Sequence, residues 1–361
     1  MNIYPTDAKE RIDPMNLNYL FNNTFSQDIA IDLGTDNTLI YIQGKGVVLT
    51  EPSYISYDKS SRRIAAVGSE AKEMAGKAPR TIKVIKPIEK GVVADLEMAS
   101  KMLGSFISRV CEKNLLKPRA VVSVPAESTD VEQRALCDLL KQAGARDVFL
   151  VEAPLAAAAG AGCDISLARG MLIADLGGGK SDAASISLGA SVIKKSINTS
   201  GNTINEEIIK YVKKAHNLNI GEVSAERVKC EIGCAYPFEL SKTTAVSGCD
   251  VTSGMPRTIT LNSEELREVI TPSVREFAAL ITGVLEDTPP ALQSDIMEDG
   301  ILITGGGAML YGIDKFLRSE TGIKIFTTEN SDRCVINGVG GELIKLDNPS
   351  ANRYFFSIYD N

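Results

Sequence analysis

The chain contains a single histidine, His216, and this scarcity argues against two common kinds of active site. A serine hydrolase needs a histidine beside its nucleophile, and the sequence also lacks the G-x-S-x-G segment that positions many such serines. The seven cysteines are scattered, and Cys230 and Cys234, which stand four apart, do not form a convincing zinc set with one histidine. We therefore expect neither Ser-His-Asp hydrolysis nor a structural zinc ion.

Long apolar runs and export signals are also missing. No apolar segment approaches the ~20 residues of a membrane-spanning helix, and the opening residues, MNIYPTDAKERIDP, lack the apolar centre of a signal peptide. Without export, the odd number of cysteines predicts reduced, buried thiols. The net charge of −7 argues against a nucleic-acid partner, and 361 residues with 44% apolar content predict a globular chain of two domains.

The most informative stretch is residues 171–182, MLIADLGGGKSD. An apolar run that ends in an acid and a glycine-rich turn predicts a buried strand followed by a tight loop, whose backbone N–H groups can approach an anion. The segment is not a P-loop, because Ala174 stands where a P-loop needs glycine. The alternation of Ala184, Ile186 and Leu188 with polar residues also predicts a strand rather than a helix after the turn.

The same unit occurs earlier, because residues 28–38 read DIAIDLGTDNT and align with the later stretch. One copy alone is equally well explained as an ordinary tight turn. Two copies, with Asp32 and Asp175 at matching places, predict two related lobes that grip a ligand with several phosphates. We expect these two aspartates to face Mg²⁺ through water, because Mg²⁺ keeps much of its hydration shell.

A third glycine cluster and a charged pair complete the expected site. Residues 301–304 are predicted to form a strand that runs into Gly305, Gly306 and Gly307 and then a helix, whose N-terminus suits an anion or a nucleobase edge. Glu226 and Lys229 share one face of a predicted helix. They form either a surface ion pair or a clasp for a ribose and an adenine edge.

Other local signals predict individual elements. Thr129 and Glu132 have capping-box spacing at a helix start, Pro154 opens a helix of small residues, and Pro272 predicts a break in a long helix over 264–287. Residues 59–90 are charged and less regular, which suggests an inserted subdomain.

The segment 112–119, EKNLLKPR, places Leu115 and Leu116 among cations. The leucines either fold inward or dip into a membrane while Lys117 and Arg119 meet anionic head groups. Before it, residues 1–27 are polar with a weak apolar pattern, which favours a flexible arm over a membrane anchor; after residue 345 we expect an unstructured tail.

The order and spacing of the three glycine sites resemble the actin superfamily. Five stretches are similar to MreB, the bacterial actin of cell shape: DIAIDLGTDNTLIYIQGKGVVLTEPS, VGSEAKEMAGKAP, KPIEKGVVADLEMASKML, SAERVKCEIGCAYP and ILITGGGAMLYGIDKFLRSETG. The resemblance implies an α/β, two-lobed actin-like (ribonuclease H-like, duplicated) fold with four subdomains. Its expected parts are an arm (1–27), lobe I (28–170, with an insertion at about 58–90), lobe II (171–345, with an insertion at about 206–274) and a tail (346–361).

The resemblance also implies ATP or ADP with Mg²⁺ in the cleft between the lobes. By position, Thr35, Asp36 and Asn37 hold phosphates together with Gly177, Gly178 and Gly179. Two further segments would bind the adenosine. One consists of Glu226, Arg227, Val228 and Lys229, and the other of Gly305, Gly306, Gly307 and Ala308. It further implies filaments of this chain, with MreB paralogues such as those of wall-less helical bacteria as further partners, in the cytoplasm at the inner face of the cell membrane.

Two of the positions that depart from the MreB pattern concern hydrolysis. The family's glutamate that orients the attacking water is replaced by Ala153, and the assisting threonine by Lys180. A methyl group cannot orient or deprotonate water, whereas a lysine can hold the terminal phosphate. We therefore expect weak or absent hydrolysis, unless Glu152 takes over; as the strand neighbour of Ala153 it should point away. Asn202 and Asn205 also replace the family's usual aspartates.

Overall fold

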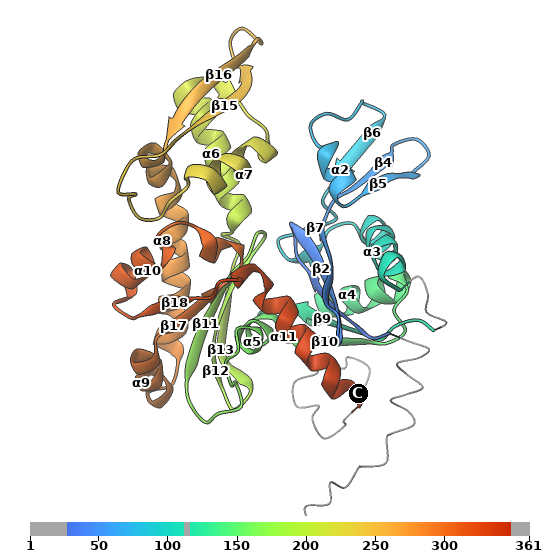
Figure 1. Ribbon diagram of the computed structural model, residues 1–361, viewed down its shortest axis with the longest axis vertical. Helices are drawn as coiled ribbons and strands as arrows, with labels where there is room; N and C mark the ends of the chain where they lie inside the picture. Colours follow the sequence, from blue (N-terminus) through green and yellow to red (C-terminus); the bar gives the residue numbers. More distant parts are fainter. Residues whose placement is uncertain (1–26, 112–115, 348–361) are drawn as a thin grey trace, which may run out of the picture.

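The computed structural model describes residues 27–111 and 116–347, which form two lobes side by side (Figure 1). Leu115, the arm before residue 27 and the tail after residue 347 lie outside the described residues. Each lobe is built on a five-stranded mixed sheet. In spatial order the strands of lobe I are β10 (Val148–Glu152), β9 (Ala120–Val124), β1 (Ile29–Leu33), β2 (Asn37–Ile42) and β3 (Gly46–Pro52). Those of lobe II are β13 (Ala190–Ile197), β12 (Ser181–Ser187), β11 (Met171–Leu176), β17 (Ile301–Thr304) and β18 (Ile325–Thr327).

The two sheets have the same topology. In lobe I, β1 pairs antiparallel with β2, β2 antiparallel with β3, and β1 and β10 both pair parallel with β9. In lobe II, β11, β12, β13, β17 and β18 repeat these directions in the same order. The duplication predicted from the two D-L-G stretches is therefore present in the strand order. It also confirms that a strand, not a helix, follows the turn of residues 177–180.

Each lobe carries a smaller sheet at its upper end in Figure 1. In lobe I the order is β5 (Ile64–Val67), β4 (Ile55–Asp58) and β6 (Ile82–Ile85), with helix α2 (Ser69–Glu73) and the hairpin of β7 (Ile88–Glu89) and β8 (Val92–Val93) nearby. In lobe II the order is β14 (Leu218–Asn219), β15 (Thr243–Asp250) and β16 (Pro256–Asn262). The stretch of lobe I expected to be less regular, residues 59–90, thus contributes the strands β5 and β6, the helix α2 and the strand β7, joined by turns.

The helices pack on these sheets and bury their apolar faces. The chain before residue 171 supplies α3 (Leu96–Cys111), α4 (Asp130–Ala143) and α5 (Ala153–Gly160). The later chain supplies α6 (Gly201–His216), α7 (Glu222–Ile232), α8 (Ser263–Asp287), α9 (Pro290–Asp299), α10 (Ile313–Thr321), α11 (Cys334–Glu342) and the short 3-10 helices η1 (Gly306–Met309), η2 (Ser331–Arg333) and η3 (Leu343–Asp347). Two of these helices cross between the lobes, because α5 packs mainly against β11 and β12 of lobe II, whereas α11 packs against β1, β9 and β2 of lobe I. The capping box predicted at Thr129 and Glu132 is formed at the start of α4, and Pro154 lies in the first turn of α5.

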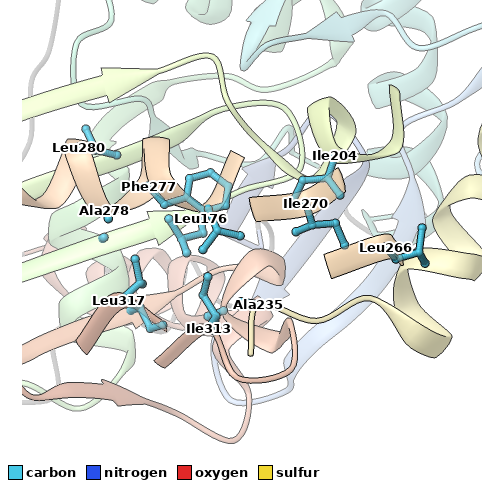
Figure 2. Packing of buried hydrophobic residues seen from close by; sticks show 14 of the residues in the cluster. Leu176, Ile204, Ala235, Leu266, Ile270, Phe277, Ala278, Leu280, Ile313 and Leu317 are labelled. Atoms are coloured by element: carbon cyan, nitrogen blue, oxygen red, sulfur yellow. The ribbon is translucent and has the colours of Figure 1, made fainter. Parts of the chain in front are cut away.

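One local prediction was wrong. Pro272 does not break α8, which runs unbroken through it. Its neighbours Ile270 and Val274 are fully buried in the core of lobe II, so packing offsets the one backbone hydrogen bond that proline removes. Figure 2 shows Ile270 and Phe277 of this helix in that core.

The strand β17 and the third glycine cluster are followed by a helix, as predicted. The cluster itself starts the 3-10 helix η1 at Gly306, and the α-helix α10 begins at Ile313.

The lobes are joined where α5 crosses α11, at the centre of Figure 1. The crossing is close because each helix contributes a glycine. A Cβ atom on Gly160 would lie 1.8 Å from the carbonyl oxygen of Cys334, and one on Gly338 would lie 1.8 Å from that of Ala156. Small residues therefore set the distance between the lobes at this point.

Candidate functional site

A cleft between the lobes, with a cavity of about 610 Å³, brings most of the predicted site residues together. It is lined by Asp32, Thr35, Asp36, Asn37, Ala153, Asp175, Gly177, Gly178, Gly179, Lys180, Glu226, Lys229, Gly305, Gly306 and Gly307, among others. Three predicted residues are not among the lining residues. Arg227 points its guanidinium at Glu231, Thr244 and the carbonyl of Ala245, and Val228 and Ala308 are buried in the core of lobe II.

The two hairpin turns at the cleft are closed in the same way. The amide of Gly34 donates to the carbonyl of Asn37 at 3.0 Å, and the amide of Gly177 donates to the carbonyl of Lys180 at 3.0 Å. Each turn needs its first glycine, because a Cβ on Gly34 would lie 2.8 Å from the oxygen of Asn37 and one on Gly177 would lie 2.5 Å from that of Lys180. The sequence repeat is therefore also a repeat of backbone geometry.

The turns face each other across the cleft at van der Waals distance. A Cβ on Gly178 would lie 2.0 Å from Oδ2 of Asp36, and one on Gly179 would lie 2.0 Å from Oγ1 of Thr35. The N-terminus of α6 adds to this arrangement, because the amides of Gly201 and Asn202 donate to carbonyls of the second turn. Glycine-rich turns in close apposition leave backbone near the cavity with little side chain in the way, which suits an anionic ligand.

The carboxylate of Asp36 is already occupied by protein groups. Its Oδ1 accepts from Nζ of Lys86 at 2.8 Å and from Nδ2 of Asn202 at 3.0 Å. Lys86 also pairs with Glu222 at the start of α7. Asp36 and Lys86 belong to lobe I, whereas Asn202 and Glu222 belong to lobe II, so these bonds cross the cleft. Residues 35–37 are predicted to hold phosphates, and within this segment the side chain of Asp36 connects the two lobes.

The structure disfavours the charged form of the two aspartates that stand at matching places in the lobes, Asp32 and Asp175. Burial raises the pKa of Asp32 to about 6, although a hydrogen bond from Ser123 Oγ at 2.9 Å acts in the opposite direction. Burial, together with the charges of Asp182 and Asp32, raises the pKa of Asp175 to about 7. Asp182 is the cross-strand partner of Asp175. A bound cation would relieve this repulsion, so the residues fit a magnesium site.

Among the described residues, no group of three or more His, Cys, Asp or Glu side chains is arranged to hold a metal directly. Mg²⁺ is typically bound by one or two carboxylates, several waters and substrate phosphates. Asp32 and Asp175 would supply the carboxylates of such a site.

Lys180 is a cation at the floor of the cleft. Its aliphatic stem runs along Gly91, where an added Cβ would lie 3.6 Å from Lys180 Cδ. Its charge lowers the pKa of Glu132, a smaller effect than the hydrogen bonds of the capping box. The ammonium makes no hydrogen bond or ion pair with any residue in the described ranges 27–111 and 116–347, and the side chain lines the cavity. It can therefore meet an anion there at little cost in existing bonds.

The junction of β10 and α5 places Ala153 and Glu152 on opposite sides. Ala153 lines the cavity. Glu152 is buried and points toward β13, where its carboxylate accepts from Ser191 Oγ at 2.6 Å and pairs with Lys194. The expectation that Glu152 points away from the cleft is confirmed, and its carboxylate is fully engaged elsewhere.

Beside the second hairpin turn, Glu226 and Lys229 pair at 2.7 Å, and a Cβ on Gly201 would lie close to both Lys229 Nζ and Gly178 Cα. Burial acts to raise the pKa of Glu226, but Lys229 and hydrogen bonds bring it below its ordinary value. Asn205 donates to Glu226 at 2.5 Å, and Lys229 donates to the carbonyl of Gly201 at 3.0 Å. Both residues line the cavity, so the pair is part of the cleft wall rather than a simple surface ion pair.

Sequence reasoning missed several residues that line the cavity. Lys86 was hidden in a charged stretch, and Phe238 and Tyr311 lie in loops far apart in the chain. Of these residues only Tyr311 had a signal in the sequence, because it is an aromatic residue that stands shortly after the third glycine cluster. The substitution at position 202 gave a usable signal, because asparagine can donate to Asp36 and aspartate cannot.

The segment considered for membrane contact is only partly described, since Leu115 lies outside the described residues. Leu116 is 48% exposed. Arg119, expected to face head groups, is instead paired with Asp28 through bonds of 2.5–3.1 Å and is mostly buried. No helix in the described part of the chain is both long and apolar enough to cross a membrane.

Comparison with known proteins agrees with the geometry of the two lobes. Residues 26–350 match the family described as MreB/Mbl protein. The chain belongs to this family. It is 42% identical to the cell shape-determining protein MreB of Escherichia coli K12 over 333 residues, covering 91% of this chain and 96% of that protein. It is also 42% identical to the cell shape-determining protein Mbl of Bacillus subtilis, covering 90% and 97%.

A solved structure of a family member supports the same fold. The structure of MreB5 of Spiroplasma citri bound to AMPPNP superposes with a TM-score of 0.86 at 35% identity, covering 91% of this chain and 98% of that one. MreB5 has also been solved bound to ADP. As an MreB/Mbl member with this superposition, the chain has the α/β, two-lobed actin-like fold.

Proposed function

We propose that this MreB/Mbl member binds ATP or ADP with Mg²⁺ in the cleft, assembles into cytoskeletal filaments that govern cell shape, and hydrolyses ATP weakly or not at all. Nucleotide binding is supported by the nucleotide-bound structures of MreB5 and by the two apposed glycine turns. Filament formation for cell shape is supported by family membership and by the names of the curated relatives. The partners would be other copies of this chain, with MreB paralogues as further candidates.

The proposal assigns each part of the nucleotide and its metal ion to a different group of residues in the cleft. The backbones of Gly177, Gly178 and Gly179 and of residues 35–37 would hold the phosphates, with Lys180 beside the terminal one. Asp32 and Asp175 would hold Mg²⁺ through water, and that ion would neutralise phosphate charge. Glu226, Lys229 and residues 305–307 would contact the nucleoside. Arg227, Val228 and Ala308 would then act only by placing the backbone of their segments.

The proposal of impaired hydrolysis rests on one observation, which is that Ala153 lies in the cleft whereas the carboxylate of Glu152 does not. Ala153 lines the cavity, whereas Glu152 is buried against Ser191 and Lys194. Hydrolysis of a bound triphosphate needs a group that orients and deprotonates water, and such a group typically contributes about 10²–10⁴-fold in rate. The side chain of Ala153 has no polar atom, so the chain would hold ATP without cutting it efficiently.

The alternative is a filament-forming ATPase with ordinary turnover through Glu152. It would require Glu152 to leave two hydrogen-bond partners and to turn across the strand. Hydrogen bonds of a charged group are worth about 1.5–3 kcal/mol, and solvent screening lowers the part due to Lys194, whose side chain is 40% exposed. The alternative is therefore less favoured.

The experiment compares phosphate release from the purified protein with that of the double variant Ala153→Glu with Lys180→Thr. We expect slow release from the natural chain and a rise of about 10²-fold or more in the variant. Lys195→Gln, a change outside the cleft, serves as the matched control and should leave the rate unchanged. A natural chain that releases phosphate as fast as active family members would contradict the proposal.

Membrane association is a separate part of the proposal, with the filament at the cytoplasmic, inner face of the cell membrane. Its support is the exposure of Leu116 beside Leu115 in a segment that contains Lys113 and Lys117. Replacing both leucines, Leu115→Ser with Leu116→Ser, should reduce co-sedimentation with anionic liposomes, whereas the exposed-residue control Leu240→Ser should not. Equal sedimentation of the double variant and the natural chain would assign membrane contact to another segment.

A further inference from the structure

Two aromatic side chains stack in the wall of the cavity. Phe238, between α7 and β15, and Tyr311, between η1 and α10, have ring centroids 4.0 Å apart and planes inclined by 22°. The ammonium of Lys242 lies over the Phe238 ring at 4.2 Å from its centroid. Phe238 is therefore held between Lys242 and Tyr311, and it supports one face of the tyrosine ring.

The pair lies where the two segments assigned to the nucleoside meet. Cys234, just after α7, forms a backbone bridge with Tyr311, and the amide of Ala235 donates to the carbonyl of Tyr311 at 2.8 Å. The helix of Glu226 and Lys229 and the loop of residues 305–307 are thus joined at this tyrosine. Phe238 and Tyr311 both line the same cavity as those residues.

The side chains at this part of the cavity leave much of their apolar surface exposed. Tyr311 is 40% exposed, and Met309 beside it is 66% exposed. Apolar groups left exposed inside a concave site, with a few polar groups converging on it, are typical of ligand-binding surfaces. Glu226 and Lys229 supply the polar groups of this end of the cavity.

We propose that Tyr311, backed by Phe238, is the platform on which the base of the bound nucleotide stacks, and that purine nucleotides are the favoured ligands. The inference rests on the nucleotide binding proposed above. Stacking on an aromatic face is available to every base and increases with the size of the ring system, so a purine gains more than a pyrimidine. The phosphates, which the glycine turns would hold, contribute equally to both.

The test measures dissociation constants by calorimetry, in the presence of Mg²⁺, for ADP, UDP and inorganic tripolyphosphate. Tyr311→Ala should weaken ADP binding about tenfold or more, since stacking on one aromatic ring is worth 5- to 150-fold in affinity by alanine substitution. It should leave tripolyphosphate binding unchanged and reduce the preference for ADP over UDP. Tyr311→Phe, which keeps the ring, should bind ADP like the natural chain.

Tyr236→Ala is the matched control. Tyr236 is also a half-exposed tyrosine in this region, with Lys315 over its ring at 5.4 Å, but it does not line the cavity. Thermal unfolding of each variant checks that the fold is intact. If Tyr311→Ala binds ADP as tightly as the natural chain, the platform is wrong and nucleotide binding still stands. If the natural chain binds neither ADP nor tripolyphosphate, nucleotide binding itself fails.

Discussion

The first and second hairpin turns share a backbone and differ in charge. Residues 34–37 and 177–180 are closed by the same amide-to-carbonyl bond, follow matching aspartates and face each other across the cleft. The first turn carries the carboxylate of Asp36, which bonds to Asn202 and Lys86. The second carries the ammonium of Lys180, which lies at the cavity. The two copies thus share their backbone geometry, while their side chains differ: Asp36 joins the lobes, and Lys180 lies at the cavity.

The sharpest way to break this comparison is to remove the cation from the second turn. Lys180→Gln keeps a polar chain of similar length and removes the charge. Because a hydrogen bond to a charged group is worth about 1.5–3 kcal/mol, we expect AMPPNP to bind about 10- to 100-fold more weakly. ADP, which lacks the terminal phosphate, should be affected far less.

The measurement is a pair of calorimetric titrations, with Lys195→Gln on β13 as the control because it removes a lysine charge outside the cavity. An equal loss of ADP and AMPPNP affinity would mean that Lys180 acts on the cleft as a whole and not on the terminal phosphate.

The second prediction concerns the bond between the lobes. Asn202→Asp replaces the donor to Asp36 with a second carboxylate at 3.0 Å, so a hydrogen bond becomes a repulsion. We expect the free energy of unfolding to fall by about 1 kcal/mol, because the contact is only part-buried. Urea unfolding gives the value.

A reversed pair tests whether the contact itself is responsible. Asp36→Asn with Asn202→Asp exchanges donor and acceptor, and this double variant should recover part of the lost stability. Asn219→Asp, at an exposed position on β14, supplies the same charge change away from the cleft. If the double variant is no more stable than Asn202→Asp alone, the two side chains are not coupled.

The hairpins show what local sequence can and cannot predict. The strand–turn–strand unit at 171–187 was predictable because periodicity and glycine act within a few residues, as was the capping box of Thr129. Pro272 misled because the burial of its neighbours in a distant core outweighs a local rule. The contact of Lys86 with Glu222 and the stack of Phe238 on Tyr311 join segments far apart in the chain, and no local pattern indicates such pairs.

The residues of the candidate site also differ in how far the sequence could predict them. The glycine turns, Asp32 and Asp175 could be placed from the repeat alone, because duplication marks them twice. Arg227 and Val228 were assigned with their segment, yet a helix turns successive residues in different directions, and only Glu226 and Lys229 of that segment line the cavity. A motif predicts which segment reaches a site, whereas helix geometry decides which of its side chains do.

The smallest expected effect concerns the aspartates, the feature that the two lobes share. Both have raised pKa values, about 6 for Asp32 and about 7 for Asp175, so each charge destabilises the folded chain when no cation is near. Asp175→Asn should therefore raise the unfolding temperature in the absence of Mg²⁺, by roughly 1–2 °C for each kcal/mol gained in a chain of this length. An asparagine carbonyl can still accept the bond from Thr304.

Asp32→Asn should stabilise the chain less than Asp175→Asn does, because only Asp175 has the carboxylate of Asp182 opposite it in the sheet. Thermal unfolding with and without Mg²⁺ and ADP distinguishes the two contributions. Each variant should gain stability alone and lose part of the stabilisation that Mg²⁺ and ADP give together. A variant that is stabilised and yet keeps the full effect of Mg²⁺ would show that its aspartate repels its neighbours without holding the ion, and the two lobes would then differ in this feature as well.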